Sequence, residues 1–204
     1  NLRILLNRRS EINYKITQDI IGFPNQMSTC VLGGQAITDG RISISNPGLE
    51  RILETAKEDE SGLVRLYLAG SIPRFTPEFG HRLAAELATK SQDAEDRTQP
   101  KLIWYGYEPI ANLLPHRAID LAFDSHIPLL TQNIARRLTF NIQTEPEIVD
   151  KLTVQLKGAE RDKIHSVLLG MTQALKGWNQ APTPRDWTAT KAVLSSRRDP
   201  HINR

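Results

Sequence analysis

Five histidines are the residues of this chain with the widest choice of chemistry, because an imidazole can act as a base, a nucleophile or a metal ligand near neutral pH. They are His81, His116, His126, His165 and His201. No HExxH motif is present, and no two of them stand at a spacing that would place both imidazoles on one metal ion. The histidines therefore predict no metal site.

One short stretch contains the three residue types of a hydrolase triad, namely Asp124, Ser125 and His126. Adjacent residues cannot direct their side chains at one another as a triad requires. We therefore favour Asp124 or Ser125 as the cap of the following helix. His116 follows Pro115 in the first turn of another predicted helix, where a structural role is again favoured. An all-α hydrolase or lyase using His116 or His126 stays a remote alternative, which would require histidines and carboxylates to share one pocket.

Cofactor chemistry lacks the residues that it needs. A single cysteine, Cys30, excludes an internal disulfide and a zinc site built on several thiolates. No CxxCH occurs, so a c-type haem cannot be attached to this chain. Gly33-Gly34 is followed neither by the further glycines of a dinucleotide loop nor by the lysine of a phosphate loop. We therefore predict no catalytic, cofactor-binding or metal-binding residue.

An aromatic segment, Trp104-Tyr105-Gly106-Tyr107-Glu108-Pro109, allows two interpretations. Three large aromatic residues in four positions could stack on a sugar or a base. On a helix, however, Trp104 and Tyr107 are neighbours at i and i+3, with Glu108 at i+4 from Trp104. We favour packing between helices, with Glu108 paired to an arginine, and keep a binding surface as the alternative.

Composition describes an ordinary soluble globular protein. The chain has 204 residues, of which 39% are hydrophobic and 24% charged, with a formal net charge of +3. Its basic pairs (Arg8-Arg9, Arg136-Arg137 and Arg197-Arg198) are scattered, which does not indicate nucleic-acid binding. No apolar run approaches the length of a transmembrane helix, so we expect no direct membrane insertion. The chain begins at Asn1 rather than methionine, which is compatible with a segment of a longer protein.

Short helices must position these residues. Apolar spacing, capping residues and prolines predict helices over about 46–56, 61–72, 76–87, 102–114, 115–123, 125–138, 144–156, 164–175 and 183–193, with a loop at 91–99. Pro109 is expected to kink or break its helix, and Gly177 to end another at a C′ position. Trp187 and Val193 are assigned to the last helix. Residues 1–45 are expected to form a less regular helical entry segment, and 46–204 a helical repeat array.

One buried face returns along the chain. Val64, Leu68, Ala69 and Ile72 are matched, 66 positions later, by Leu130, Ile134, Ala135 and Leu138. This i, i+4, i+5, i+8 pattern is one face of a helix, and its return after about two thirty-odd-residue units is typical of stacked helical repeats. The sequence therefore predicts an all-α, HEAT-like α-solenoid of paired short antiparallel helices. Asp59, ahead of Val64 and Arg65, is expected to cap a helix or to pair with an arginine of an adjoining repeat.

Four segments together resemble a known region. The run from Asp59 to Phe75, then 94–96, the run from Leu102 to Ile110, and 127–138 are similar to the HEAT-like segment of bacterial membrane-bound dehydrogenase-like haem proteins. The tail at 168–177, with Pro184-Arg-Asp-Trp187, also resembles the end of that segment. The resemblance covers about 37–200 and is clearest over 59–138. In that family the segment generally lies between a sugar-dehydrogenase-like β-propeller and a cytochrome c domain.

The resemblance implies a scaffold and not a catalyst, because the family's haem motif is missing here and its oxidoreductase activity is assigned to the propeller. We therefore expect a non-catalytic scaffold that joins or orients domains of a larger haem-containing protein, with no cofactor of its own. Its partners would be neighbouring domains of the parent chain or another protein, and not nucleic acid. The family leads us to expect the cell envelope or periplasm. The alternative is a free-standing helical-repeat adaptor that binds a protein or peptide on its concave face.

Overall fold

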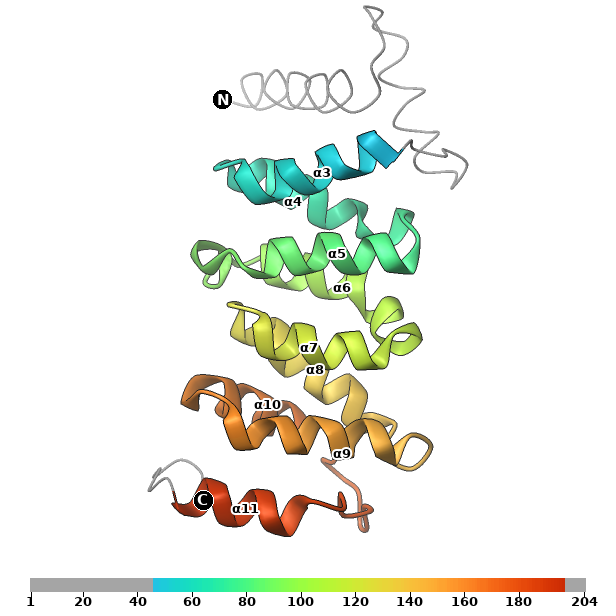
Figure 1. Cartoon of the computed structure of the whole chain (residues 1–204), viewed down its shortest axis with the longest axis vertical. Coiled ribbons are helices and arrows are strands. Elements are labelled where there is room, and N and C mark those ends of the chain that lie inside the picture. The colour runs from blue at the N-terminus through green and yellow to red at the C-terminus, as the bar shows by residue number, and fades with distance from the viewer. Residues whose placement is uncertain (1–45, 197–204) are drawn as a thin grey trace, which may run out of the picture. The chain divides into compact units, whose positions relative to one another are not determined.

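The computed structural model describes residues 46–196, and this part of the chain is helical without any strand (Figure 1). Its nine α-helices are α3 (Asn46–Glu58), α4 (Gly62–Ser71), α5 (Pro77–Ala88), α6 (Gln99–Leu113), α7 (Pro115–Asp124), α8 (Pro128–Phe140), α9 (Pro146–Gln155), α10 (Arg161–Ala174) and α11 (Trp187–Ser196). Three 3-10 turns, η1 (Ile72–Arg74), η2 (Ser91–Asp93) and η3 (Leu156–Gly158), lie between them. The predicted all-α class is confirmed.

Several predictions concern residues outside the described part. These are the helical entry segment over 1–45, Cys30, Gly33-Gly34, the arginine pairs at 8–9 and 197–198, and His201. The chain divides into two compact units, Asn1–Leu87 and Ala88–Arg204, and each is described by itself.

The described helices of the first unit share an apolar core and one bridging ion pair. Leu68, Ala69 and Ile72 are all at most 4% exposed, as the repeat pattern predicts for this face. Arg82 of α5 donates to both carboxylate oxygens of Glu50 in α3, at 2.8 and 2.9 Å. This bond lowers the pKa of Glu50, but both side chains are well exposed, so the pair adds little stability.

The second unit has two layers of helices (Figure 1). In one layer α8 packs between α6 and α10; in the other α9 packs between α7 and α11. The layers meet where α8 contacts α7 and α9. Leu130, Ile134, Ala135 and Leu138 of α8 are at most 2% exposed, so the second copy of the predicted buried face is also confirmed.

A glycine lets α8 and α10 approach closely. A Cβ atom on Gly170 of α10 would lie 2.2 Å from the backbone oxygen of Gln132 and 3.0 Å from the Cβ of Ala135, both in α8. Real side chains do not tolerate such a distance to a backbone atom. Gly170 therefore sets the separation of these two helices.

Short side chains just ahead of the helices satisfy free amide groups. Asp59 accepts from the Ser61 amide (2.8 Å) before α4. Asp96 accepts from the amides of Thr98 and Gln99 (both 2.7 Å) at the start of α6, and these bonds lower its pKa. Asp59 thus closes a turn at Ser61, the residue before α4, and no described side chain caps the amides of this helix, so the predicted cap is not observed. The buried Arg65 donates to the backbone oxygen of Asp59 (3.1 Å), a contact with the main chain that the sequence did not predict.

Two helices differ from their predicted form. Helix α6 continues through Pro109, because this proline is exposed and the carbonyl that lacks its amide partner can reach water. Helix α11 begins at Trp187 and not at Thr183, and it buries Thr190 and Leu194. Trp187 and Val193 both lie in this helix, as predicted.

Candidate functional site

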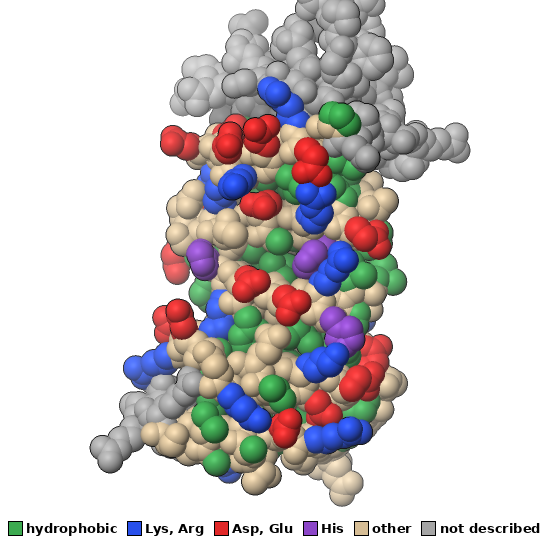
Figure 2. Space-filling model, in the orientation of Figure 1, with side chains coloured by type: hydrophobic (Ala, Val, Ile, Leu, Met, Phe, Trp, Pro, Cys, Tyr) green, Lys and Arg blue, Asp and Glu red, His purple; other side chains and the backbone are tan. Residues whose placement is uncertain are grey.

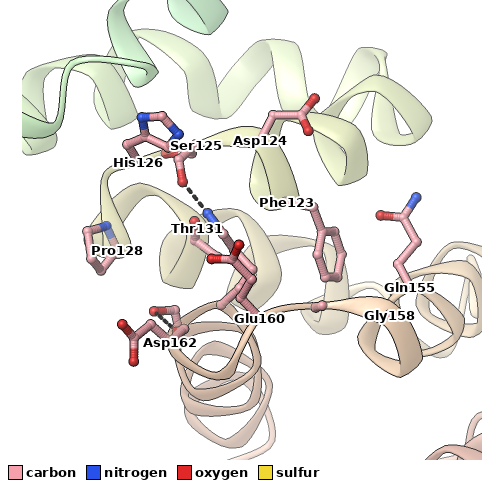
Figure 3. A pocket seen from close by; sticks show the side chains of 13 residues that line it. Phe123, Asp124, Ser125, His126, Pro128, Thr131, Gln155, Gly158, Glu160 and Asp162 are labelled. Atoms are coloured by element: carbon pink, nitrogen blue, oxygen red, sulfur yellow. Dashed lines mark hydrogen bonds between the residues drawn. The ribbon is translucent and has the colours of Figure 1, made fainter.

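The second unit has a cleft of about 700 Å³ between the α7–α8 turn and the start of α10 (Figure 3). Its lining includes the Asp124-Ser125-His126 stretch, which allows a direct test of the triad interpretation. The lining residues are Phe123, Asp124, Ser125, His126, Pro128, Thr131, Gln155, Gly158, Ala159, Glu160, Asp162, Lys163 and Ser166.

The α7–α8 turn is fixed by hydrogen bonds to the end of α5 and the residue after it. The backbone amide of His126 donates to the Ala88 oxygen at 2.7 Å. The His126 ring places Nδ1 2.9 Å from the Thr89 oxygen. A carbonyl oxygen accepts only, so Nδ1 carries the proton and Nε2 holds the lone pair of the neutral ring. The imidazole thus anchors a turn through the nitrogen that a triad would present to its aspartate.

Ser125 uses its hydroxyl group to bond the backbone of Ile127. Its Oγ accepts from the Ile127 amide (3.0 Å) and donates to the Ile127 oxygen (3.3 Å), and the residue is 1% exposed. Of the two residues predicted as a cap, Ser125 is the one that satisfies an amide ahead of α8. Figure 3 shows the His126 imidazole and the Asp124 carboxylate directed away from each other. The three residues line one cleft but do not form a nucleophile–base pair.

Lys163 is the cationic group closest to the turn. Its Nζ donates to the backbone oxygen of Ser125, across the cleft from α10. Burial lowers the pKa of Lys163, and the nearby carboxylates of Asp124 and Glu160 oppose this effect. No sequence motif identifies Lys163 as a residue of the cleft. The packing of α10 against α8 is what brings its side chain to the α7–α8 turn.

The remaining hydroxyl groups of the cleft are also bonded to the backbone. Thr131 Oγ1 donates to the Ala122 oxygen (2.9 Å), and Ser166 Oγ to the Asp162 oxygen (2.9 Å). Asp124, Glu160 and Asp162 are exposed. One histidine and three carboxylates therefore share the cleft, as the remote hydrolase alternative requires, but no hydroxyl is presented to the imidazole.

The other described histidines do not line this cleft. His116 is exposed near the start of α7, with Nδ1 3.4 Å from Lys151 Nζ of α9. His81 and His165 lie in α5 and α10. Over residues 46–196, no group of three or more histidine, cysteine, aspartate or glutamate side chains could hold a metal ion.

The aromatic segment packs as the helical interpretation predicted. Trp104 is 3% exposed and Tyr107 0% exposed, and burial raises the pKa of Tyr107. Tyr105, between them, is 66% exposed, so the three rings do not form one stacking platform. Glu108 forms no ion pair with an arginine in the part of the chain that the structure describes, which makes the predicted pairing wrong.

A second group of exposed residues lies at the C-terminal ends of α6, α8 and α10. Phe140 of α8 packs edge-on against Trp178, which follows α10, with ring centroids 6.4 Å apart. The Arg137 guanidinium lies 5.9 Å from the centre of the Phe140 ring. Arg137 Nε donates to Asn112 Oδ1 of α6 at 2.7 Å. These contacts join three helix ends through partly exposed side chains, and the sequence patterns did not predict them.

Comparison with known proteins yields no matching family, no similar curated protein and no similar solved structure. Within the described residues, no helix has both the length and the apolar character that a membrane span requires.

Proposed function

We propose that residues 46–196 belong to a HEAT-like α-solenoid that acts as a non-catalytic scaffold, joining or orienting domains of a larger protein. The observation that supports it best is the return of one buried face in α4 and α8, at positions 66 residues apart. Repeated helical units bury a continuous core between neighbours and leave long surfaces for partners. The packing of α8 between α6 and α10 is the kind of contact that such an array requires.

The side chains of the cleft support a structural role. Ser125, Thr131 and Ser166 use their hydroxyl groups on backbone oxygens, and His126 uses Nδ1 in the same way. A hydrolase would need an accessible nucleophile within hydrogen-bond reach of its base. A turn that connects two repeats needs its backbone groups satisfied, and this is what these residues do.

We further propose that the parent protein is a haem-containing, dehydrogenase-like protein of the cell envelope. The resemblance of residues 59–138 to the HEAT-like segment of such proteins supports this proposal, as an analogy of sequence. Scaffold residues would then be under selection for packing and spacing, while redox chemistry would reside in neighbouring domains.

The experiment is to determine the complete reading frame that encodes this segment. We expect a propeller-like, strand-rich region upstream and a CxxCH-bearing domain downstream. Start and stop codons close to positions 1 and 204 would contradict the spacer role and favour the free-standing adaptor. Hydrolysis by the purified chain that is lost in a His126→Ala variant, but kept in a His116→Ala variant, would overturn the non-catalytic proposal altogether.

A specific observation favours the adaptor as the second candidate. Leu113 is 64% and Phe140 55% exposed, at the ends of two helices that Arg137 joins. Exposed apolar side chains grouped at one place indicate a contact surface more often than scattered ones do.

A further inference from the structure

The side chains at the C-terminal ends of α6, α8 and α10 form what we call the arginine–aromatic surface, defined as Leu113, Arg137, Phe140 and Trp178. Leu113 follows Asn112 in α6, and Asn112 receives the Arg137 hydrogen bond from α8. Phe140 lies beneath the Arg137 guanidinium and against the Trp178 ring. The surface is thus contributed by three helices of one layer, which places it within the second unit.

This surface is preorganised. Arg137 is held at two points, by its bond to Asn112 (2.7 Å) and by its position over Phe140 (5.9 Å). A guanidinium that is already fixed loses less side-chain freedom when it binds a carboxylate, and its planar fork can pair with both oxygens. Leu113 and Phe140 expose more than half of their surface beside it. Apolar area and an oriented cation are therefore available together.

The charge of the surface is uncompensated. Within the described residues, neither Arg136 nor Arg137 forms an ion pair, and Lys176 stands two residues before Trp178. Glu108, four residues before Asn112 in α6, is the nearest acidic residue along that helix. The Arg137 guanidinium therefore keeps a positive charge that no carboxylate of the described residues pairs with. Figure 2, by contrast, shows positive and negative side chains interspersed over the face that it presents.

We propose that the arginine–aromatic surface is the docking site for an acidic segment of a partner protein in which carboxylates alternate with aliphatic side chains. Arg137 would pair with a carboxylate, while Leu113 and the exposed edge of Phe140 would contact the aliphatic groups. This inference deepens the scaffold function proposed above by naming the kind of segment that the scaffold holds. The occupant is a peptide and not a nucleic acid, because one face of the Phe140 ring is occupied by Arg137 and its neighbour Trp178 meets it edge-on at 70°. Two rings that meet edge-on, one of them with a face covered, are poorly arranged to hold successive stacked bases.

The test is fluorescence polarisation of the full chain with a short fluorescein-labelled peptide of alternating glutamate and leucine. We expect saturable binding in the micromolar range, weakened by salt. A lysine–leucine peptide and a glutamate–serine peptide should each bind at least about tenfold more weakly, because one lacks the charge and the other the apolar groups. A labelled oligothymidylate that bound more tightly than the glutamate–leucine peptide would overturn the proposal in favour of nucleic acid.

Variants locate the site. Arg137→Gln removes the charge but keeps an amide that can donate to Asn112. Phe140→Ala removes an exposed ring. Neither substitution changes a buried residue, so both variants should keep the fold. Each is expected to weaken peptide binding at least about fivefold. Lys191 is an exposed residue of α11, in the other layer of helices. The Lys191→Gln variant makes the same charge change as Arg137→Gln and should leave the affinity for the peptide unchanged.

Two results would contradict the inference. One is the absence of peptide binding below about 1 mM; the other is an equal loss of affinity in Lys191→Gln and Arg137→Gln, which would reveal attraction by net charge alone. Neither bears on the scaffold proposal, which the reading frame tests separately. A CxxCH domain downstream combined with no peptide binding would retain the scaffold and reject this docking site.

Discussion

Polar residues of the described cleft largely satisfy the backbone, although their types are also those that catalytic sites use. Ser125, Thr131 and Ser166 each donate their hydroxyl group to a main-chain oxygen. Helix ends and turns leave amides and carbonyls without partners, and short hydroxyl side chains are the groups best placed to bond them. A sequence motif alone does not distinguish this use from catalysis.

Two buried threonines of α8 provide a prediction at this scale. Thr131 and Thr139 are both fully buried, but only Thr131 has a hydrogen-bond partner in the described part of the chain. Thr139→Val should therefore stabilise the fold by about 1 kcal/mol, because it removes a buried hydroxyl that is not bonded. Thr131→Val should destabilise it by about 1–3 kcal/mol, because the Ala122 oxygen loses its donor. Urea unfolding measures both, and equal effects of the two substitutions would refute this assignment.

A second residue-scale prediction concerns Gly170. In Gly170→Ala the new methyl group would meet the Gln132 backbone oxygen, so α8 and α10 must separate. We expect a loss of about 1–3 kcal/mol, which exceeds the gain of about 1 kcal/mol from the better helix propensity of alanine. Gly158→Ala is the matched control, because nothing lies within 4 Å of its Cβ position. It should be neutral or slightly stabilising, and a loss equal to that of Gly170→Ala would show that contact with α8 is not the cause.

At the scale of elements, the buried faces of the helices are what the sequence determines most clearly. Leu68 of α4 is 4% exposed, whereas Leu63 of the same helix is 36% exposed. Leu68→Ala should lower the free energy of unfolding by about 2–5 kcal/mol, and Leu63→Ala by less than about 1 kcal/mol. Chemical denaturation of the two variants compares one substitution on two faces of one helix. A loss below about 0.5 kcal/mol for Leu68→Ala would make the face assignment wrong.

Strong periodicity and proline-marked starts explain which elements could be predicted. The prolines that open α7 and α9 placed those helices correctly, and the repeat of Leu68 at Ile134 identified the buried face of α8, which begins at Pro128 and not at the predicted Ser125. The start of α11 was predicted too early, at Thr183, and the burial of Thr190 was not predicted, because Thr190 is held by a hydrogen bond to the Thr153 oxygen (3.3 Å) and belongs to no apolar pattern. A polar residue that is buried through one hydrogen bond does not contribute to a hydrophobic pattern, so its burial cannot be predicted from such a pattern.

The cleft and the arginine–aromatic surface could not be predicted for a different reason. Each is built from segments that are distant in sequence: Ser125 with Lys163, and Asn112 with Arg137 and Trp178. Periodicity indicates which face of a helix is buried, but not which two helices become neighbours. Only the packing of α8 between α6 and α10 brings these side chains together.

At the scale of the whole molecule, the chain separates into two compact units at 87–88, with most described helices in the second. In repeat proteins, stability is the sum of local terms, so one region can open while another stays folded. A protein with one indivisible core would instead lose protection everywhere when any buried residue is truncated. In the proposed array, truncating a buried residue should therefore reduce protection only near that residue, whereas in a single cooperative domain it would reduce protection everywhere.

Hydrogen exchange followed by mass spectrometry of the Leu68→Ala variant measures this consequence. Peptides from α3 and α4 should exchange about tenfold or more faster than in the unsubstituted protein, since a loss of about 1.4 kcal/mol in local stability corresponds to a tenfold change. Peptides from α8 and α10 should keep their protection, because Leu130, Ile134 and Gly170 are packed within the second unit. The reciprocal variant, Ile134→Ala, should accelerate exchange in α8 and α10 while α4 is spared. Uniform acceleration in both variants would indicate one cooperative core, and the scaffold would then have to act as a single rigid block and not as an array of repeats.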